Sequence, residues 1–155
     1  MANIAVGKKI PAFSAEVTGG SPIATKDLKG QKFVLYFYPR DNTPGCTNES
    51  KDFRDLHKKF RRKKVRIIGI SRDTLASHER FKKKFDFPFE LIADPDETIC
   101  NLFGVMKNKN MYCKRVRGIE RSTFLIDENR VLLKEWRKVK VNGHAQEVLD
   151  SLSKL

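Results

Sequence analysis

The sequence predicts an α/β fold in which a central mixed β-sheet is flanked by helices, with a β-hairpin at the N-terminus. Strand-like and helical segments alternate between residues 33 and 104, an order that builds parallel strands joined by helices. The segment FVLYFY (33–38) is apolar throughout, as in a strand buried on both faces. Turn residues near both ends of the chain indicate hairpins, whose antiparallel pairing makes the sheet mixed.

The first half of the chain carries a hairpin, a buried strand and a long helix. Gly19 and Gly20 separate two short β-rich segments and indicate the N-terminal hairpin. After the buried strand, Phe53, Leu56 and Phe60 recur at helical spacing, with basic residues on the opposite face. The expected elements are strands at 13–17, 23–24 and 33–38 and an amphipathic helix over 47–62.

The second half continues the alternation and closes with a hairpin and a helix. Asp94 is expected to be the N-cap of the third helix, with Pro95 at its first position and Gly104 near its end. Residues 106–118 are polar and show no regular pattern. Apolar residues spaced i, i+3, i+4 and i+7 mark the C-terminal helix. The expected elements are strands at 65–71, 89–92, 123–127 and 131–136 and helices at 75–85, 95–104 and 145–152.

Length and composition favour one soluble domain over residues 1–155. Hydrophobic residues make up 39% of the 155 residues and charged residues 33%, which suits a packed core. No apolar run approaches the roughly 18 residues of a membrane span, and no secretory signal is evident, so a cytoplasmic protein is expected. The three cysteines form no CxxC pair or zinc spacing, so neither a disulfide framework nor a metal or other cofactor is expected.

One cysteine lies where a thiol becomes reactive. Cys46 is expected in the first turn of the first long helix, at the carboxyl end of a sheet strand, where open α/β folds place their ligands. Free backbone N–H groups and the helix dipole favour the thiolate there. Thr43 can offer a hydroxyl to the sulfur or to an oxygen bound beside it, while Pro39 and Pro44 stiffen the loop. The alternative interpretation is an inert core cysteine.

The same segment resembles a known family. FVLYFYPRDNTPGCTNES resembles the active-site stretch of peroxiredoxins, most closely the bacterioferritin comigratory protein (peroxiredoxin Q) subfamily, and Pro39, Thr43 and Cys46 match its PxxxTxxC motif. The likeness continues in GISRD (69–73) and RGIERSTFLID (117–127). It implies a thioredoxin-like fold and a thiol-dependent peroxidase whose Cys46 a hydroperoxide oxidises to sulfenic acid. It also implies reduction by thioredoxin, glutaredoxin or a small thiol, and a monomer.

The resemblance also assigns two charged residues. The catalytic arginine of the family maps to Arg121, and a guanidinium can hydrogen-bond both to the sulfur and to a peroxide oxygen. The alternative for Arg121 is a solvated surface charge. Glu49 lies one helical turn after Cys46 and resembles a family acid that can orient Arg121. Its alternative is an ordinary first-turn glutamate favoured by the helix dipole.

The chain departs from the subfamily in its resolving cysteine. One usual position holds Lys51, and the other falls in HERFKKKF (78–85), which contains no cysteine. Cys100 is expected to be a core thiol, and Cys113, in a polar basic stretch, an exposed one. A cycle that uses only Cys46 and is resolved by an external thiol is preferred, while a disulfide between Cys46 and Cys113 remains open.

Two other readings of the sequence are weaker. His57, His78 and His144 show no ligand spacing and are interpreted as partly solvated surface imidazoles, which gives no support to a cysteine protease. The formal net charge of +13 and the basic runs at 57–66 and 80–85 suggest a polyanion- or nucleic-acid-binding protein as the alternative function. Basic helix faces also occur simply because lysine and arginine solubilise a surface.

Overall fold

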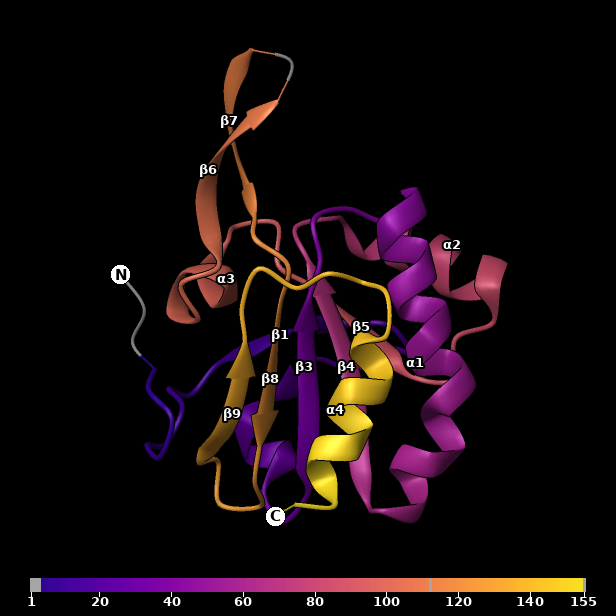
Figure 1. Cartoon of the computed structure of the whole chain (residues 1–155), viewed down its shortest axis with the longest axis vertical. Helices are drawn as coiled ribbons and strands as arrows, with labels where there is room; N and C mark the ends of the chain where they lie inside the picture. The colour runs from indigo at the N-terminus through magenta and orange to yellow at the C-terminus, as the bar shows by residue number, and fades with distance from the viewer. Residues whose placement is uncertain (1–3, 112, 155) are drawn as a thin grey trace.

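Within residues 4–111 and 113–154, which the computed structural model describes, seven strands form one sheet in the order β2-β1-β5-β4-β3-β8-β9 (Figure 1). The neighbours β3–β4 and β4–β5 are parallel, and the other pairs are antiparallel, so the sheet is mixed as predicted. The strands are β1 (Ser14–Val17), β2 (Ile23–Ala24), β3 (Lys32–Phe37), β4 (Val65–Ser71), β5 (Glu90–Ala93), β6 (Met106–Met111), β7 (Lys114–Ile119), β8 (Ser122–Ile126) and β9 (Leu132–Trp136). The helices are η1 (Thr25–Leu28), α1 (Pro44–Arg62), α2 (Leu75–Phe85), α3 (Thr98–Leu102) and α4 (His144–Leu152).

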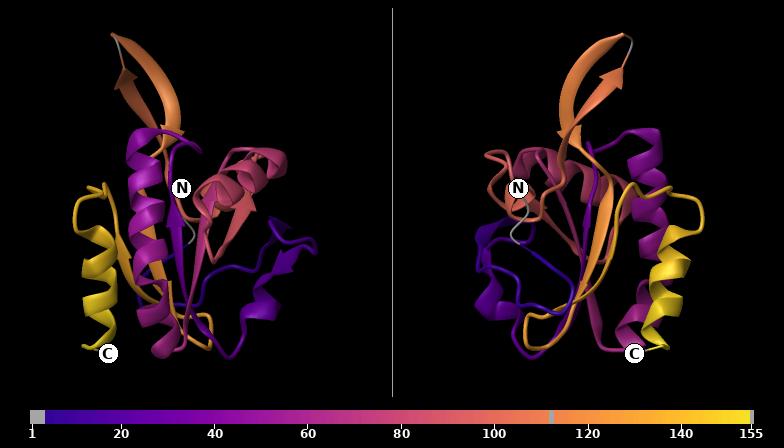
Figure 2. Two further views of the ribbon diagram at one scale, coloured as in Figure 1. Left: turned by 90° about the vertical axis from the view of Figure 1, so that its right-hand side faces the viewer. Right: turned by 60° about the vertical axis from the view of Figure 1, so that its left-hand side comes forward.

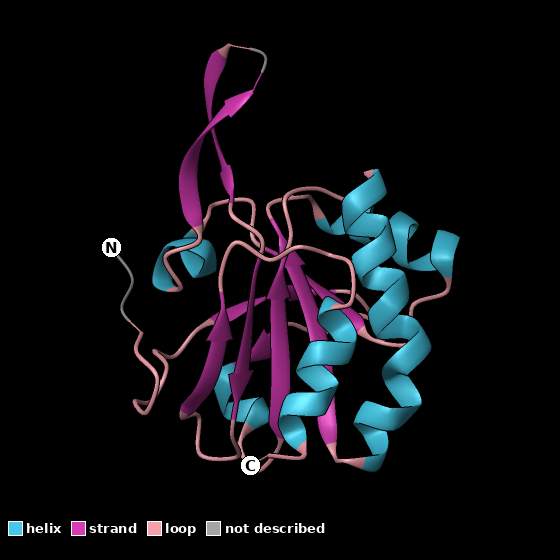
Figure 3. Cartoon of the chain, viewed as in Figure 1, coloured by secondary structure: helices cyan, strands magenta, loops and turns pink. Residues whose placement is uncertain are grey.

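The central strand β3 is buried on both faces. Phe33, Leu35 and Phe37 belong to one core cluster, whereas Val34 and Tyr36 belong to the other, and all five side chains are fully buried. This is the alternation that successive residues of a strand impose. Helices α1 and α4 cover one face of the sheet, and α3 with the N-terminal segments covers the other (Figures 2 and 3). The predicted thioredoxin-like architecture is confirmed in these layers.

Helix α1 begins earlier than its apolar pattern indicates. Thr43 has the extended backbone of an N-cap, and Pro44 occupies a first-turn position, so the helix starts at Pro44 rather than at residue 47. Proline suits this position because it needs no backbone N–H there. The buried residues Phe53 and Phe60 fix the helix to the sheet, and basic residues in its last turn complement the dipole.

The third helix is shorter than expected. Helix α3 begins at Thr98 with Glu97 as its N-cap, so the prediction that Asp94 caps a helix starting at Pro95 was wrong. A turn intervenes, in which the Glu97 N–H donates to the Asp94 carbonyl. The Asp94 carboxylate nevertheless accepts hydrogen bonds from the backbone N–H groups of Ile99 and Cys100, at 3.2 and 2.8 Å. It therefore caps the helix from outside it.

An unpredicted hairpin occupies the polar stretch from residue 106 to 118. Strands β6 and β7 pair from Met106 and Ile119 to Met111 and Lys114, and the hairpin, here called the arm, projects from the sheet (Figure 1). The side chains of β7 are exposed up to Arg117. A hairpin with solvent on both faces shows no apolar alternation, which is the signal by which a strand is recognised in a sequence.

Among the described residues, no helix is long and apolar enough to cross a membrane.

Candidate active site

Cys46 lies in the first turn of α1, where the chain returns from the carboxyl end of β3. Only 1% of the residue is exposed, and it packs in the core cluster that contains Tyr36 and Phe53. The sulfur is thus shielded from bulk water yet close to the free N–H groups of the helix start. Free N–H groups at a helix start favour a thiolate, whereas removal from water disfavours any charged group.

A guanidinium from just before the strand next to β3 contacts this sulfur. Arg121, directly before β8, donates from Nη2 to Cys46 Sγ at 3.3 Å and from Nη1 to Glu49 Oε1 at 2.6 Å. The structure therefore brings together three residues that the sequence analysis singled out. Arg121 is not a solvated surface charge, because its side chain is only 15% exposed. Its position next to the sulfur can stabilise negative charge there and on an oxygen bound beside it.

Burial and the neighbouring charges shift the pKa values of both partners, Glu49 and Arg121. Burial raises the pKa of Glu49 to about 7, although the charge and hydrogen bond of Arg121 act to lower it. The second carboxylate oxygen, Oε2, is buried and has no hydrogen-bond partner among the described residues, which adds to the cost of ionising the group. Burial acts to lower the pKa of Arg121, but the charges of Glu49 and Cys46 outweigh it and raise the pKa above its ordinary value. Arg121 therefore stays cationic.

The two remaining predicted site residues shape the loop. The Thr43 hydroxyl donates to the carbonyl of Arg40 at 3.0 Å, so its proton points to the backbone rather than to the sulfur. The Thr43 carbonyl accepts the N–H of Thr47 and begins the helix. Pro39 is half-buried, two residues beyond the end of β3. The structure thus shows Thr43 and Pro39 in the loop that leads to Cys46.

The other two cysteines differ sharply in environment. Cys100 is fully buried in α3, and burial, with the nearby Asp94 carboxylate, raises the pKa of its thiol far above the ordinary range. Cys113 is exposed and lies at the turn of the arm with a positive φ of 64°. All three cysteines are free. These environments agree with the expected core thiol and exposed thiol.

The interpretation of the histidines as surface groups was wrong for two of them. His78 is fully buried between Asp41 and the carbonyl of Ile92, and His144 is 3% exposed with Nε2 at 2.7 Å from the Thr123 hydroxyl. Burial lowers the pKa of His144. His57 is half-buried, as expected, and burial lowers its pKa too. The helical period of a sequence shows which residues lie on the same helix face as a histidine. It does not show which distant segment of the chain packs on that face.

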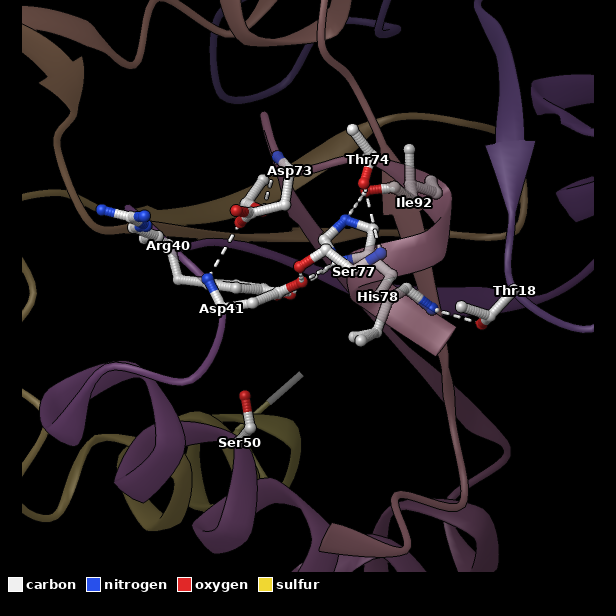
Figure 4. A network of polar contacts seen from close by, with 12 residues as sticks. Thr18, Arg40, Asp41, Ser50, Asp73, Thr74, Ser77, His78 and Ile92 are labelled. Carbon is white, nitrogen blue, oxygen red and sulfur yellow. Dashed lines mark hydrogen bonds and ion pairs between the residues drawn. The ribbon is translucent and has the colours of Figure 1, made fainter. Parts of the chain in front are cut away.

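Sequence reasoning missed a polar cluster next to the active-site loop (Figure 4). It comprises Tyr38, Asp41, Asp73, Ser77 and His78, and is here called the Asp41 cluster. A signal was present, since Asp41 and Asp73 both follow parallel neighbours, β3 and β4, whose carboxyl ends meet at one edge. Ligand atoms of Asp41, Asp73 and His78 lie within 4.8 Å of one another, close enough to hold a cation, but they already bond within the cluster.

Comparison with known proteins agrees with this geometry. The AhpC/TSA family matches residues 6–134. A putative peroxiredoxin bcp of Coxiella burnetii is 47% identical over 97% of this chain and 99% of the relative, and Peroxiredoxin Bcp of Bacillus subtilis is 46% identical over 96% and 95%. A Xanthomonas campestris Peroxiredoxin Q structure superposes with a TM-score of 0.87 at 45% identity over 92% and 90% of the two chains. A mutant of Xylella fastidiosa PrxQ gives a TM-score of 0.93 at 39% identity over 99% and 98%.

A buried thiol at a helix start, held under a guanidinium on a thioredoxin-like sheet, defines a thiol peroxidase. The chain belongs to the AhpC/TSA family and, within it, to the Bcp or peroxiredoxin Q group of peroxiredoxins. The alternative of a polyanion-binding protein finds no support in these relatives, which are peroxiredoxins by name. The basic run at 80–85 belongs to α2, and the run at 57–66 to the end of α1 and the start of β4.

Gly45 allows Arg121 to approach the sulfur closely. A methyl group at this position would lie 3.3 Å from Arg121 Nη2. We expect Gly45→Ala to displace the guanidinium and slow oxidation of Cys46 by hydrogen peroxide by on the order of tenfold. The fold should persist because alanine favours helices over glycine. Stopped-flow single-turnover oxidation measures the rate, with the exposed Asn48→Ala as control, and equal rates for both variants would contradict the prediction.

Glu49→Gln tests the burial of the carboxyl group. Because folding raises the pKa of Glu49 from 4.5 to about 7, the folded chain binds this proton more tightly than the unfolded chain. The stabilisation of the folded protein by this proton is complete below the pKa that Glu49 has in the unfolded chain. It is lost as pH rises through the pKa that Glu49 has in the folded chain. Between pH 5 and pH 8, the free energy of unfolding of the wild type should fall relative to Glu49→Gln by on the order of 2 kcal/mol. Urea unfolding at both pH values measures it; a constant difference would refute it.

Proposed function

We propose that this thiol peroxidase reduces hydrogen peroxide and organic hydroperoxides through a sulfenic acid at Cys46. The observation that carries the proposal is the 3.3 Å contact between Arg121 Nη2 and Cys46 Sγ. A guanidinium at this place can stabilise the charge that moves from sulfur to oxygen during attack on a peroxide. A Xanthomonas campestris relative of 44% identity is described by its alkyl peroxide reduction activity, which supports the same substrate class.

In the first step, the Cys46 thiolate attacks one peroxide oxygen. The S–O bond forms as the O–O bond breaks, and the departing oxygen takes up a proton and leaves as an alcohol or as water. Sulfur is oxidised by two electrons and the peroxide is reduced by two. Arg121 binds the charge as it passes from sulfur to oxygen, while Glu49 orients Arg121. Rotation of the Thr43 hydroxyl away from the Arg40 carbonyl lets it donate to the peroxide, and Pro39 shapes the loop.

In the second step, an external thiol resolves the sulfenic acid. The thiol condenses with Cys46–SOH to a mixed disulfide and water, and a second thiol regenerates Cys46 and releases a disulfide. The reductant is thioredoxin, glutaredoxin or a small thiol, and the protein works as a cytoplasmic monomer. Lys51 stands at one usual resolving position, and the segment 78–85 that would hold the other contains no cysteine. Cys100 is buried, so the chain favours a cycle with Cys46 alone.

Cys46→Ser should abolish thiol-dependent peroxide consumption while the protein stays folded. A serine hydroxyl does not ionise near neutral pH and so supplies no comparable nucleophile. Peroxide loss in the presence of dithiothreitol measures turnover, and circular dichroism checks the fold. Cys100→Ser, which changes another buried thiol, is the matched control and should retain turnover. Turnover by Cys46→Ser at the wild-type rate would overturn the proposed function.

The double variant Cys100→Ser/Cys113→Ser should turn over with dithiothreitol at nearly the wild-type rate, because neither sulfur is needed to resolve Cys46. Mass spectrometry after one equivalent of hydrogen peroxide, with a sulfenic-acid trap, should find the trap on Cys46 in wild type and double variant alike. The competing mechanism has a distinct result. If the wild type forms a disulfide between Cys46 and Cys113, and Cys113→Ser alone loses thioredoxin-driven turnover, then Cys113 is the resolving residue.

A further inference from the structure

The Asp41 cluster lies next to the active-site loop, and none of its side chains takes part in the chemistry proposed above (Figure 4). His78 is fully buried, and Asp41 is 7% exposed. His78 comes from α2, and its Nε2 reaches the carbonyl of Ile92 in β5 at 2.8 Å. Asp41 comes from the loop between β3 and α1, so the cluster joins three parts of the fold.

The contacts of His78 and Asp41 join the two side chains and fix the place of the Asp41 carboxyl group. A backbone carbonyl only accepts hydrogen bonds, so His78 Nε2 carries a hydrogen. The Tyr38 hydroxyl donates to Asp41 Oδ1 at 2.6 Å, and the Ser77 hydroxyl donates to Oδ2 at 2.8 Å, so both carboxylate oxygens accept. His78 Nδ1 lies 2.7 Å from the same Oδ2, and where Asp41 is a carboxylate Nδ1 donates to it. The Asp41 side chain is then held by three donors, which come from Tyr38, Ser77 and His78.

A buried polar network of this kind imposes geometry, because each buried polar group needs its partner at a fixed place. Here the network fixes the loop between β3 and α1, which contains Asp41. The backbone N–H of Asp41 also donates to the Asp73 carboxylate at 2.9 Å, which ties the loop to the end of β4. Asp41 is thus held through both its backbone and its side chain.

The held residue controls the path of the chain to the reactive cysteine. Asn42 follows with a left-handed backbone, φ 59°, and Thr43 then begins α1 as its N-cap. The Arg40 carbonyl, directly before Asp41, accepts the Thr43 hydroxyl. A shift of Asp41 therefore displaces Thr43 and the first turn of α1, which contains Cys46.

We propose that His78 is a positioning residue for the peroxidase reaction, acting through Asp41 to hold the loop 39–43 and the start of α1 in the geometry that peroxide attack requires. The inference rests on the proposed function, since it concerns the rate of that reaction. It goes further, because the hydrogen bonds of the His78 and Asp41 side chains are with one another and with Tyr38, Ser77 and Ile92 rather than with Cys46. The imidazole acts at a distance through one hydrogen bond to a loop carboxylate.

Two substitutions of His78 separate this role from simple burial. His78→Asn places an amide N–H near the site of Nδ1 and so preserves the donor to Asp41, whereas it loses the donor to Ile92. His78→Gln places its N–H near the site of Nε2 and so preserves the donor to Ile92, whereas it loses the one to Asp41. Each variant lacks one buried hydrogen bond, and urea unfolding should show similar losses of stability.

The readouts are single-turnover oxidation of Cys46 by hydrogen peroxide and alkylation of Cys46 by iodoacetamide, which requires the thiolate but not a positioned peroxide. We expect His78→Asn to be oxidised within about threefold of the wild-type rate and His78→Gln at least about tenfold more slowly. The alkylation rates of the two variants should differ by less than about threefold. Ser77→Ala, which removes another donor to Asp41 from a half-buried position, should slow oxidation in the same direction and serves if a His78 variant does not fold.

Each contrary result has a distinct meaning. Equal oxidation rates in the two His78 variants, or in Ser77→Ala and wild type if a His78 variant does not fold, would overturn the positioning role while leaving the proposed function intact. Alkylation that slows by the same factor as oxidation would also overturn it, because the thiolate rather than the loop geometry would then have changed. A wild-type Cys46 that hydrogen peroxide does not oxidise would overturn the proposed function and this inference together.

Discussion

The burial of β3 on both faces determines where the chemistry takes place. A strand that is apolar on both sides must lie inside the sheet, and its carboxyl end then emerges between two neighbours. One neighbour, β4, is parallel and ends at the same edge, where it delivers Asp73. The other, β8, is antiparallel and begins there, and the pairing of Phe37 with Ser122 brings the preceding Arg121 to the start of α1. The sheet order therefore assembles the site.

Within that site, one buried carboxylate directs a guanidinium toward a sulfur. Arg121 presents its N–H groups in a rigid fork, so when Glu49 holds Nη1, the direction of Nη2 follows. The arrangement leaves Glu49 with an oxygen that has no partner in the described part of the chain. Its raised pKa reflects that cost. The Arg121 guanidinium is thus oriented next to Cys46 by a carboxyl group whose charged form is disfavoured by burial.

Most of the sheet could be predicted from the sequence because its strands and helices pack on a core and so show the periodicity of burial. Strand β4 and helix α2 have the predicted bounds. The arm could not be predicted, because strands with solvent on both faces have no such periodicity. At the site, Cys46 followed from its place at a helix start, whereas Arg121 and Glu49 depended on resemblance. The burial of His78 was missed because its partner Asp41 lies 37 positions away in another element.

The arm raises a problem that β-proteins commonly face. Its two strands pair only with each other in the described part of the chain, so no further strand covers their outer edges there. Such edges recruit strands from other molecules and so promote aggregation. Here Lys107, Lys114 and Arg115 project from exposed positions of the arm. Like charges on an approaching copy repel them, so the excess of basic residues acts in the arm as protection against edge-to-edge association.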